Sequence, residues 1–550
     1  MMTIKLAAID WVIVVLYFGF IIGIGVYLRK FTVTGDDFFL AGRRSSSWVA
    51  GLAFLSANLG ALEILGWTGA TYKYGIYTAH FYWIGAIPAM LFLALYMMPF
   101  YYSSKIHSVP GYLKHRFDEK TRILNAVSFA IMTILMSGIN MYLMALIFHM
   151  FLGWNWDISI WVSALTVGLY VALGGLTSAI FTEVVQFFLI WFGLFLVAIL
   201  GIIDVKGNLL QELPSSMASL WATSSDPSKN PMGVTWPGIV LGLGFVLSFG
   251  YWTTDFLVVQ RAFSARDLRA AQMCPIIASY FKMAIPVIVV GGGLIAWKLS
   301  SEGTISLFVD EKGNIIHDSA LPVLIARYYP HGLVGLGVTA LLAGFMAGQA
   351  GNISAFNTVW TYDIYKAVIK RDASESHLVW MGRFITITGI ILSVGAAYWA
   401  KQFPTIMDYI QAIFSWVNAP LFATILLGMF WKRTTPDGAF YGLLVGMLSS
   451  FFMFLALRFG WIDPYWLTFS HTPSDMSNNL WRAWWAWLIC FLVTIVVSLF
   501  TKPKSDEEIK GLVRGLTPAV DVKSYPILKR PSFWALISLF VLILLNVYFW

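Results

Sequence analysis

The chain has 550 residues, of which 59% are hydrophobic and only 12% are charged. A soluble globular domain is about one quarter charged, so this composition excludes an ordinary soluble protein. Apolar blocks of about 20 residues, enough to cross ~30 Å of hydrocarbon as a helix, recur along the whole length. We therefore expect an all-α polytopic protein that is embedded in a lipid bilayer.

The apolar blocks predict about 14 transmembrane helices. In chain order they cover residues 7–28, 47–74, 78–103, 121–151, 157–177, 182–204, 236–260, 274–299, 331–365, 379–400, 405–431, 437–457, 483–501 and 532–550. The two segments 121–151 and 331–365 are long for simple spans. No P-loop and no soluble segment of ATPase size accompanies the spans, so coupling to ATP is not expected.

The positive charge separates sharply when alternate loops are assigned to opposite sides of the membrane. One side holds 24 of the 36 Lys and Arg residues and the other holds 10, while Lys282 and Arg383 fall within spans. The richer side is cytoplasmic by the positive-inside rule, which places both termini outside an inner or plasma membrane. The net charge of +8 is thus explained by the loops, and a nucleic-acid partner is not expected.

Two spans carry polar residues and glycine at mid-depth. The stretch SANLGALEILGW, residues 56–67, contains Asn58 and Glu63, and the stretch SFGYWTTD ends at Asp255. Irregular backbone and polar groups are tolerated in a bilayer only where they line a cavity or pack within protein. We expect the two stretches to face each other or a shared cavity. Glu63, Asp255 and Lys282 either mark a transport pathway or tie helices together.

The interrupted spans are the first and the sixth when 47–74 is counted as the first. Broken helices at equivalent places in two repeats point to a transporter site at the repeat interface. The chain is therefore expected to form one transmembrane domain, residues 1–550. Its parts are an extra N-terminal helix (7–28), a first inverted repeat (47–204), a second inverted repeat (236–431) and extra C-terminal helices (437–550).

Six long stretches also carry a family resemblance: DDFFLAGRRSSSW, SVPGYLKHRFD, YVALGGLTSAIFTEVVQ, DFLVVQRAFSARDLRAAQ, NTVWTYDIYK and LLGMFWKRTTPDGAFYGLLVG. By them the chain resembles the sodium:solute symporter family, and most of all its sodium/sugar branch, which is typified by the bacterial sodium/galactose symporter. The resemblance implies a leucine-transporter-type 5+5 inverted repeat with 14 helices. It also implies secondary transport by alternating access, without covalent chemistry.

The resemblance places a substrate site on Asn58, Glu63, Tyr82, Asp255, Lys282 and Gln411, with an inner gate at Leu257. Several positions depart from the family. Glu63 replaces an amide and Asp255 an asparagine, while Tyr82 replaces an acid and Leu257 an aromatic residue. The site remains polar and sugar-sized, so a sugar, a polyol or a uronate is expected. A charged solute is the alternative, and an internal ion pair of Lys282 with either acid is an equal alternative to direct substrate contact.

The sodium site implied by the resemblance departs further. Its carbonyl positions are Ser56 and Leu59, opposite Gly344, but its two hydroxyl positions are Ala347 and Gly348, which offer no side-chain oxygen. A cation stripped of water needs oxygen ligands, so sodium binding is expected to be weak. The acid at the ion exit is present as Glu183. Three options stay open: sodium at a rearranged site, a proton carried by Glu63 or Asp255, or facilitated diffusion as a uniporter.

Other classes of protein fit less well. A non-transporting solute sensor usually adds a signalling domain, whereas the longest cytoplasmic segment here is about 502–530. A channel needs a symmetric filter, and an enzyme needs an acid, a base or a nucleophile in reacting order. The sequence thus predicts a monomeric secondary transporter of a sugar or sugar-like polar solute, with sodium or a proton as the only possible cofactor.

Overall fold

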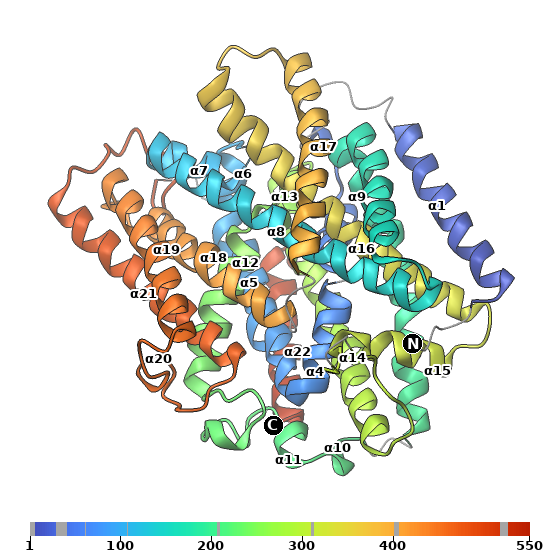
Figure 1. The fold of residues 1–550 in the computed structure, drawn as a ribbon. Coiled ribbons are helices and arrows are strands. Elements are labelled where there is room, and N and C mark those ends of the chain that lie inside the picture. The colour runs from blue at the N-terminus through green and yellow to red at the C-terminus, as the bar shows by residue number, and fades with distance from the viewer. Residues whose placement is uncertain are drawn as a thin grey trace.

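The computed structural model of the chain describes residues 6–28, 41–60, 62–106, 108–205, 209–309, 313–400, 406–516 and 526–550. These residues form a bundle of helices packed around two broken ones (Figure 1). In the described part of the chain, 10 helices are long and apolar enough to cross a membrane. The number rises to 12 if each of two bent helix pairs is one span. The all-helical membrane architecture expected from the composition is confirmed.

The spanning elements follow the predicted ranges closely. The unbroken ones are α8 (Glu119–Leu152), α14 (Leu268–Ser301), α16 (Leu333–Thr358), α17 (Glu375–Ala400), α18 (Ile406–Phe430), α19 (Pro436–Arg458), α21 (Asp475–Phe500) and α22 (Pro531–Tyr548). The predicted span 78–103 is a helical run with π turns over Phe81–Tyr102, and α16 continues as a π-helical segment to Ile369.

Two of the predicted segments are not confirmed as membrane spans. The first, 7–28, is present as α1 (Ala8–Leu28), of which only Ala8–Ile21 counts as a shorter apolar helix. The predicted spans 157–177 and 182–204 both lie in one element, α9 (Trp156–Asp204), and only Ala179–Asp204 meets the length and hydropathy of a span. The number 14 therefore stays a prediction.

The first broken helix consists of α3 (Ser47–Asn58) and the run Leu62–Ala79, which includes α4 (Trp67–Tyr74), and its two parts meet at 57°. The side chain of Ser46 caps the start of α3 by accepting the amide of Val49. The helix ends at Leu59, whose ψ of 48° lies outside the helical range. The break thus falls inside the predicted stretch, where a Cβ on Gly60 would lie only 3.3 Å from Gly348 Cα of α16.

The second broken helix bends by 48° between Gly238–Thr254, which ends with α12 (Phe249–Thr254), and α13 (Phe256–Phe263). Asp255 lies at the bend in an extended conformation, and its carboxylate accepts the amide of Leu257 at 3.0 Å. Aspartate is a favoured N-cap because its side chain satisfies an amide that the helix leaves unpaired. The acid therefore has a local role in starting α13.

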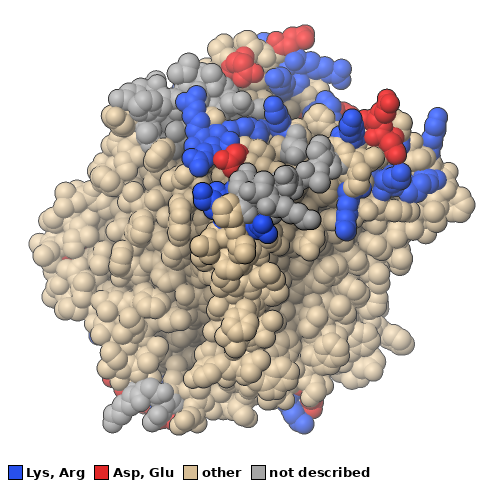
Figure 2. Space-filling view, turned by 180° about the vertical axis from the view of Figure 1, so that it is seen from behind, with Lys and Arg blue, Asp and Glu red and all other residues tan. Residues whose placement is uncertain are grey.

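Basic side chains gather at one end of the molecule (Figure 2). This basic end includes Lys105, Lys114, Arg122, Lys366 and Arg371, which line one surface groove. The C-terminus lies at the opposite end in Figure 1. The uneven distribution of charge expected from the loops is thus present in three dimensions.

Candidate functional site

A cavity of about 100 Å³ lies between the two broken helices. All seven residues predicted for the substrate site and its gate line it: Asn58, Glu63, Tyr82, Asp255, Leu257, Lys282 and Gln411. The amide of Asn58 donates to the hydroxyl of Tyr251 at 2.7 Å, so the two breaks are joined directly. The expectation that the two polar stretches share a cavity is confirmed.

An ion pair stands at the centre of this cavity. The ammonium of Lys282, on α14, lies 2.7 Å from Glu63 Oε1 and also donates to Asn58 Oδ1. Both charged side chains are largely buried, at 2% and 9% exposed. The sequence allowed an ion pair of Lys282 with either Glu63 or Asp255, and the structure contains the pair with Glu63.

Aromatic rings complete the surroundings of the ammonium. The rings of Tyr82 and Trp252 each have their centroid 5.0 Å from Lys282 Nζ, a distance at which a cation is attracted to a ring face. Trp67 and Phe81 line the same cavity and pack with centroids 4.0 Å apart. Ligand sites are typically built this way, with apolar ring surfaces and a few placed polar groups.

Asp255 lies in the same cavity but outside the ion pair. Besides the amide of Leu257, its carboxylate accepts the side-chain amide of Asn418 on α18, at 3.4 Å. Asp255 is 3% exposed, and no cationic side chain of the described residues pairs with it. The sequence alone did not show that the two cavity acids differ in this way.

The position implied for sodium is closely packed. A Cβ built on Gly344 would lie 2.9 Å from the Leu59 carbonyl, and one built on Gly348 would lie 2.8 Å from Gly60 Cα. Ala347 is fully buried, and the Ser56 carbonyl already accepts the amide of Leu59 at 3.0 Å. Small residues let the backbones of α3 and α16 touch here, as is common between membrane helices.

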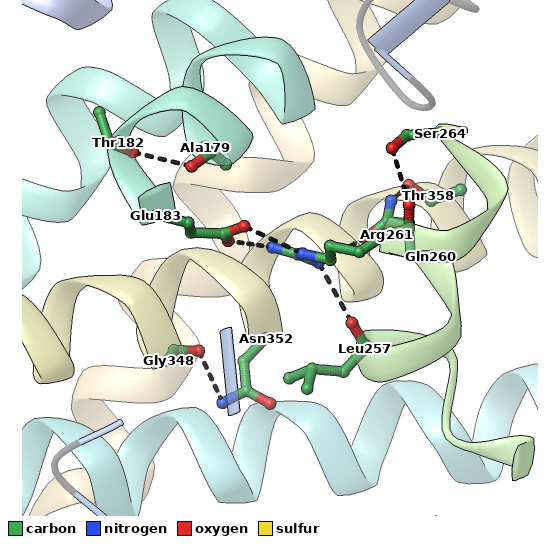
Figure 3. A network of polar contacts seen from close by, with 10 residues as sticks. All are labelled: Ala179, Thr182, Glu183, Leu257, Gln260, Arg261, Ser264, Gly348, Asn352 and Thr358. Carbon is green, nitrogen blue, oxygen red and sulfur yellow. Dashed lines mark hydrogen bonds and ion pairs between the residues drawn. The ribbon is translucent and has the colours of Figure 1, made fainter. Parts of the chain in front are cut away.

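A second buried ion pair lies next to the cavity residue Leu257 (Figure 3). Arg261 on α13 contacts both carboxylate oxygens of Glu183 on α9, one of them at 3.2 Å, and both side chains are 0% exposed. Arg261 also donates to the carbonyl of Leu257 at 3.2 Å, which ties the predicted gate to the pair. Gln260 continues the network to Thr358, the last residue of α16, at 2.9 Å.

Sequence reasoning predicted Glu183 near an ion exit but missed Arg261 as its partner. The available signal was an arginine in the apolar run FLVVQRAF, which cannot stay unpaired if it is buried. A third group toward the opposite end was also missed. There Lys73 lies 3.3 Å from Asp408, and Tyr74 donates to the same carboxylate at 3.2 Å.

These features define a class of protein. Two broken helices meet at a polar cavity, and polar contacts tie the helices together on both sides of it. This is the arrangement of a secondary transporter that exposes one central site alternately to the two sides of the membrane.

Comparison with known proteins agrees with this class. The sequence pattern described as the sodium:solute symporter family matches residues 38–446. Sodium/glucose cotransporter 1 of Sus scrofa is 28% identical over 539 residues, covering 91% of this chain and 80% of its own. The sodium/glucose cotransporter of Vibrio parahaemolyticus is 27% identical over 477 residues, covering 83% and 87%. The chain belongs to the sodium:solute symporter family.

The fold is found among solved structures. A Na+-coupled sialic acid symporter, in a substrate-bound outward-open state, superposes with a TM-score of 0.75 at 20% identity, covering 91% of this chain and 99% of that one. The fold is therefore of the leucine-transporter type, with the inverted repeat that the sequence predicted.

Proposed function

We propose that this chain carries a sugar or a sugar-like polar solute, such as a polyol or a uronate, through the central cavity. The observation that supports the proposal is the convergence of Asn58, Glu63 and Lys282 with several aromatic rings in one cavity. A pyranose ring presents hydroxyl groups at its rim and C–H groups on its faces. Charged and amide groups can hydrogen-bond to the hydroxyl groups, and the faces of aromatic rings can pack against the C–H groups. The relatives named as sodium/glucose cotransporters support the same class of solute.

The ion pair holds the site in order before the solute arrives. Lys282, Glu63 and Asn58 satisfy one another's hydrogen bonds in a low-dielectric cavity. A solute hydroxyl both donates and accepts, so it can insert between the ammonium and the carboxylate without leaving either group unpaired. An apolar solute of the same size would break these bonds without replacing them, which gives selectivity for polar solutes.

The two ends of the path fit alternating access. The helix α13, which carries Leu257 and Arg261, lies toward the basic end, and α4, which carries Lys73, lies toward the other end (Figure 1). We assign the basic end to the cytoplasm and both termini to the outside. The repeats are assigned to 47–204 and 236–431, flanked by the extra helices 7–28 and 437–550. The chain acts as a monomer in an inner or plasma membrane, and it is not an enzyme.

Sodium is the coupling ion of the family, yet this chain lacks both hydroxyl ligands at Ala347 and Gly348. Gly348 lies against the backbone of Gly60, so a ligating side chain at position 348 would require this backbone to shift. We therefore expect transport with little dependence on sodium. A sensor that binds the solute without moving it remains the second candidate, because the cavity alone does not require transport.

Solute counterflow in proteoliposomes tests the proposal. Vesicles loaded with unlabelled glucose, galactose or myo-inositol should take up the labelled solute transiently, with sodium or choline outside. Lys282→Gln should abolish this uptake, whereas Lys229→Gln should not, since Lys229 is 70% exposed and far from the cavity. Thermal stabilisation by the solutes without any counterflow would favour the sensor instead.

A further inference from the structure

We propose that Asp255 is the carboxylate through which this chain couples transport to a proton. The inference rests on the proposed transport function and adds to it the coupling ion and the residue that binds it. Its starting point is the difference between the two cavity acids: among the described residues, Glu63 has a cationic partner and Asp255 has none.

The carboxylate of Asp255 is buried, and no described residue provides a counter-ion for it. Its two contacts are hydrogen bonds from the amides of Leu257 and Asn418. A buried carboxylate without a cation costs several kcal/mol in its charged form, and neutralisation by a proton removes this cost. The site thus favours uptake of one positive charge from a neutral solution.

The other charged groups around Asp255 are already engaged. Glu63 and Lys282 neutralise each other across the cavity, and Arg261 is paired with Glu183. Tyr251, on α12, interacts electrostatically with Asp255 but hydrogen-bonds to Asn58, and α18 contributes only the neutral Asn418. Protonating Glu63 would break an ion pair, so Asp255 is the acid whose charge can change without such a loss.

The surroundings fit a proton better than a metal cation. A sodium ion needs about five or six oxygen ligands to replace its water. The groups that contact Asp255 are mostly N–H donors, whose positive ends point at the carboxylate. The Asn418 Oδ1 atom is a buried acceptor without a hydrogen bond among the described residues. This atom can accept a hydrogen bond from the O–H of a protonated Asp255. A single oxygen of this kind is not enough to complete the coordination shell of a sodium ion.

A short path of contacts links Asp255 to the inner side of the molecule. Its carboxylate binds the amide of Leu257, the carbonyl of Leu257 binds Arg261, and Arg261 binds Glu183. Protonation of Asp255 weakens its N-cap of α13, because a neutral carboxyl is a poorer acceptor than a carboxylate. The charge of Asp255 and the position of the predicted gate Leu257 therefore change together, as coupling requires. In the step itself, a proton binds one carboxylate oxygen from one side and leaves it to the other.

The test uses proteoliposomes with a pH dye inside, at zero membrane potential. Glucose, galactose and myo-inositol serve as solutes, and the one that shows counterflow is used. In the unmodified protein, adding this solute outside should acidify the lumen. A gradient of one pH unit should accumulate the solute up to ~10-fold for one proton per solute. Asp255→Asn should lose both proton influx and accumulation relative to its own rate of counterflow. Asparagine has the same shape as aspartate and can still accept the amide of Leu257, so folding should be retained.

The outcomes separate the two proposals. No counterflow in the unmodified protein would remove the proposed function itself. Counterflow without proton influx, or accumulation driven by a sodium gradient alone, would overturn the coupling by a proton. Loss of counterflow in Asp255→Asn, with unchanged melting temperature, would also overturn it, because Asp255 would then bind the solute. Retention of proton-driven accumulation in this variant would exclude Asp255, and the same assay on Glu63→Gln would then show whether Glu63 carries the proton.

Discussion

The Glu63–Lys282 pair in the cavity and the Glu183–Arg261 pair beside it are both buried, but they are held differently. Lys282 contacts Glu63 at 2.7 Å, and both side chains line the central cavity. Arg261 grips both oxygens of Glu183, and neither side chain is exposed at all. A lysine offers a compact charge on a flexible stem, whereas an arginine offers a planar fork with fixed donors.

The difference assigns the two pairs to different tasks. A pair that lines a cavity can be entered by a solute, because each of its groups can exchange its partner for a hydroxyl. A pair that is enclosed on all sides and joined to three helices cannot be entered without moving those helices. The first is therefore suited to binding and the second to holding the inner side closed until the protein changes conformation.

The largest expected effect comes from the enclosed pair. Arg261→Gln should lower the free energy of unfolding by about 3–5 kcal/mol, because it leaves the Glu183 carboxylate buried without a counter-ion. Thermal melting in detergent and the yield of folded protein measure the effect. The double variant Glu183→Gln with Arg261→Gln should recover much of the loss. Equal melting of the single and double variants would contradict the stabilising role of the charge pairing.

A smaller loss of stability is expected from the cavity pair. Lys282→Gln should cost about 2 kcal/mol, since Glu63 can still be reached by water and by the side chains around it. Solute binding, read as thermal stabilisation by the sugars, should weaken at least ~10-fold. Glu63→Gln is the matched variant and should also weaken binding. If Lys282→Gln destabilised the protein as much as Arg261→Gln, the distinction between the two pairs would fail.

The sequence predicted the membrane spans and the residues of the cavity because polar residues in apolar helices are conspicuous. Asn58, Glu63 and Asp255 stood out for this reason, and all three line the cavity. The pairing was less accessible. Whether Lys282 meets Glu63 or Asp255 depends on helix rotation, and Glu183 and Arg261 are 78 residues apart. Contacts between distant segments leave no periodic signal in a single chain.

The sodium position shows the same limit. Taken alone, the lack of hydroxyls at Ala347 and Gly348 predicts that adding them would restore sodium binding. The packing argues otherwise, because a side chain on Gly348 would lie 2.8 Å from Gly60 Cα. A glycine that has room for a side chain beside it cannot be distinguished, in a single sequence, from a glycine that permits two helices to touch.

Adding the missing hydroxyl tests this conclusion. Gly348→Ser should cost about 1 kcal/mol through overpacking and should reduce counterflow without any gain in sodium dependence. Ala347→Ser serves as the companion variant, since that position already carries a Cβ. Counterflow in sodium and in choline provides the measurement. A sodium-stimulated rate in Gly348→Ser would show that the two helices can separate to hold the ion.

The smallest effect on stability is expected at the end of the molecule opposite the basic end, where side chains are less enclosed by neighbouring helices. Asp318 lies in the short helix η9 (His317–Ser319), outside the membrane spans, and its carboxylate faces the backbone of α4. Burial, together with the negative charge of Asp408, raises the pKa of Asp318 to about 7. In the unfolded chain this pKa is about 3.9, so between about pH 4 and pH 7 the folded protein holds a proton that the unfolded chain has lost. The contribution of Asp318 to stability is thus fully present below pH 4 and is lost as the pH rises through 7.

Asp318→Asn should remove this pH dependence. At pH 8 the variant should have a higher melting temperature than the unmodified protein. The gain in the free energy of unfolding should be less than about 1 kcal/mol, because Asp318 is partly exposed. At pH 4, where Asp318 is neutral in both states, the two should melt alike. Asp463→Asn is the control, since Asp463 is 50% exposed and should show no such gain at pH 8. A gain at pH 4 equal to that at pH 8 would show that packing, rather than ionisation, governs the contact between η9 and α4.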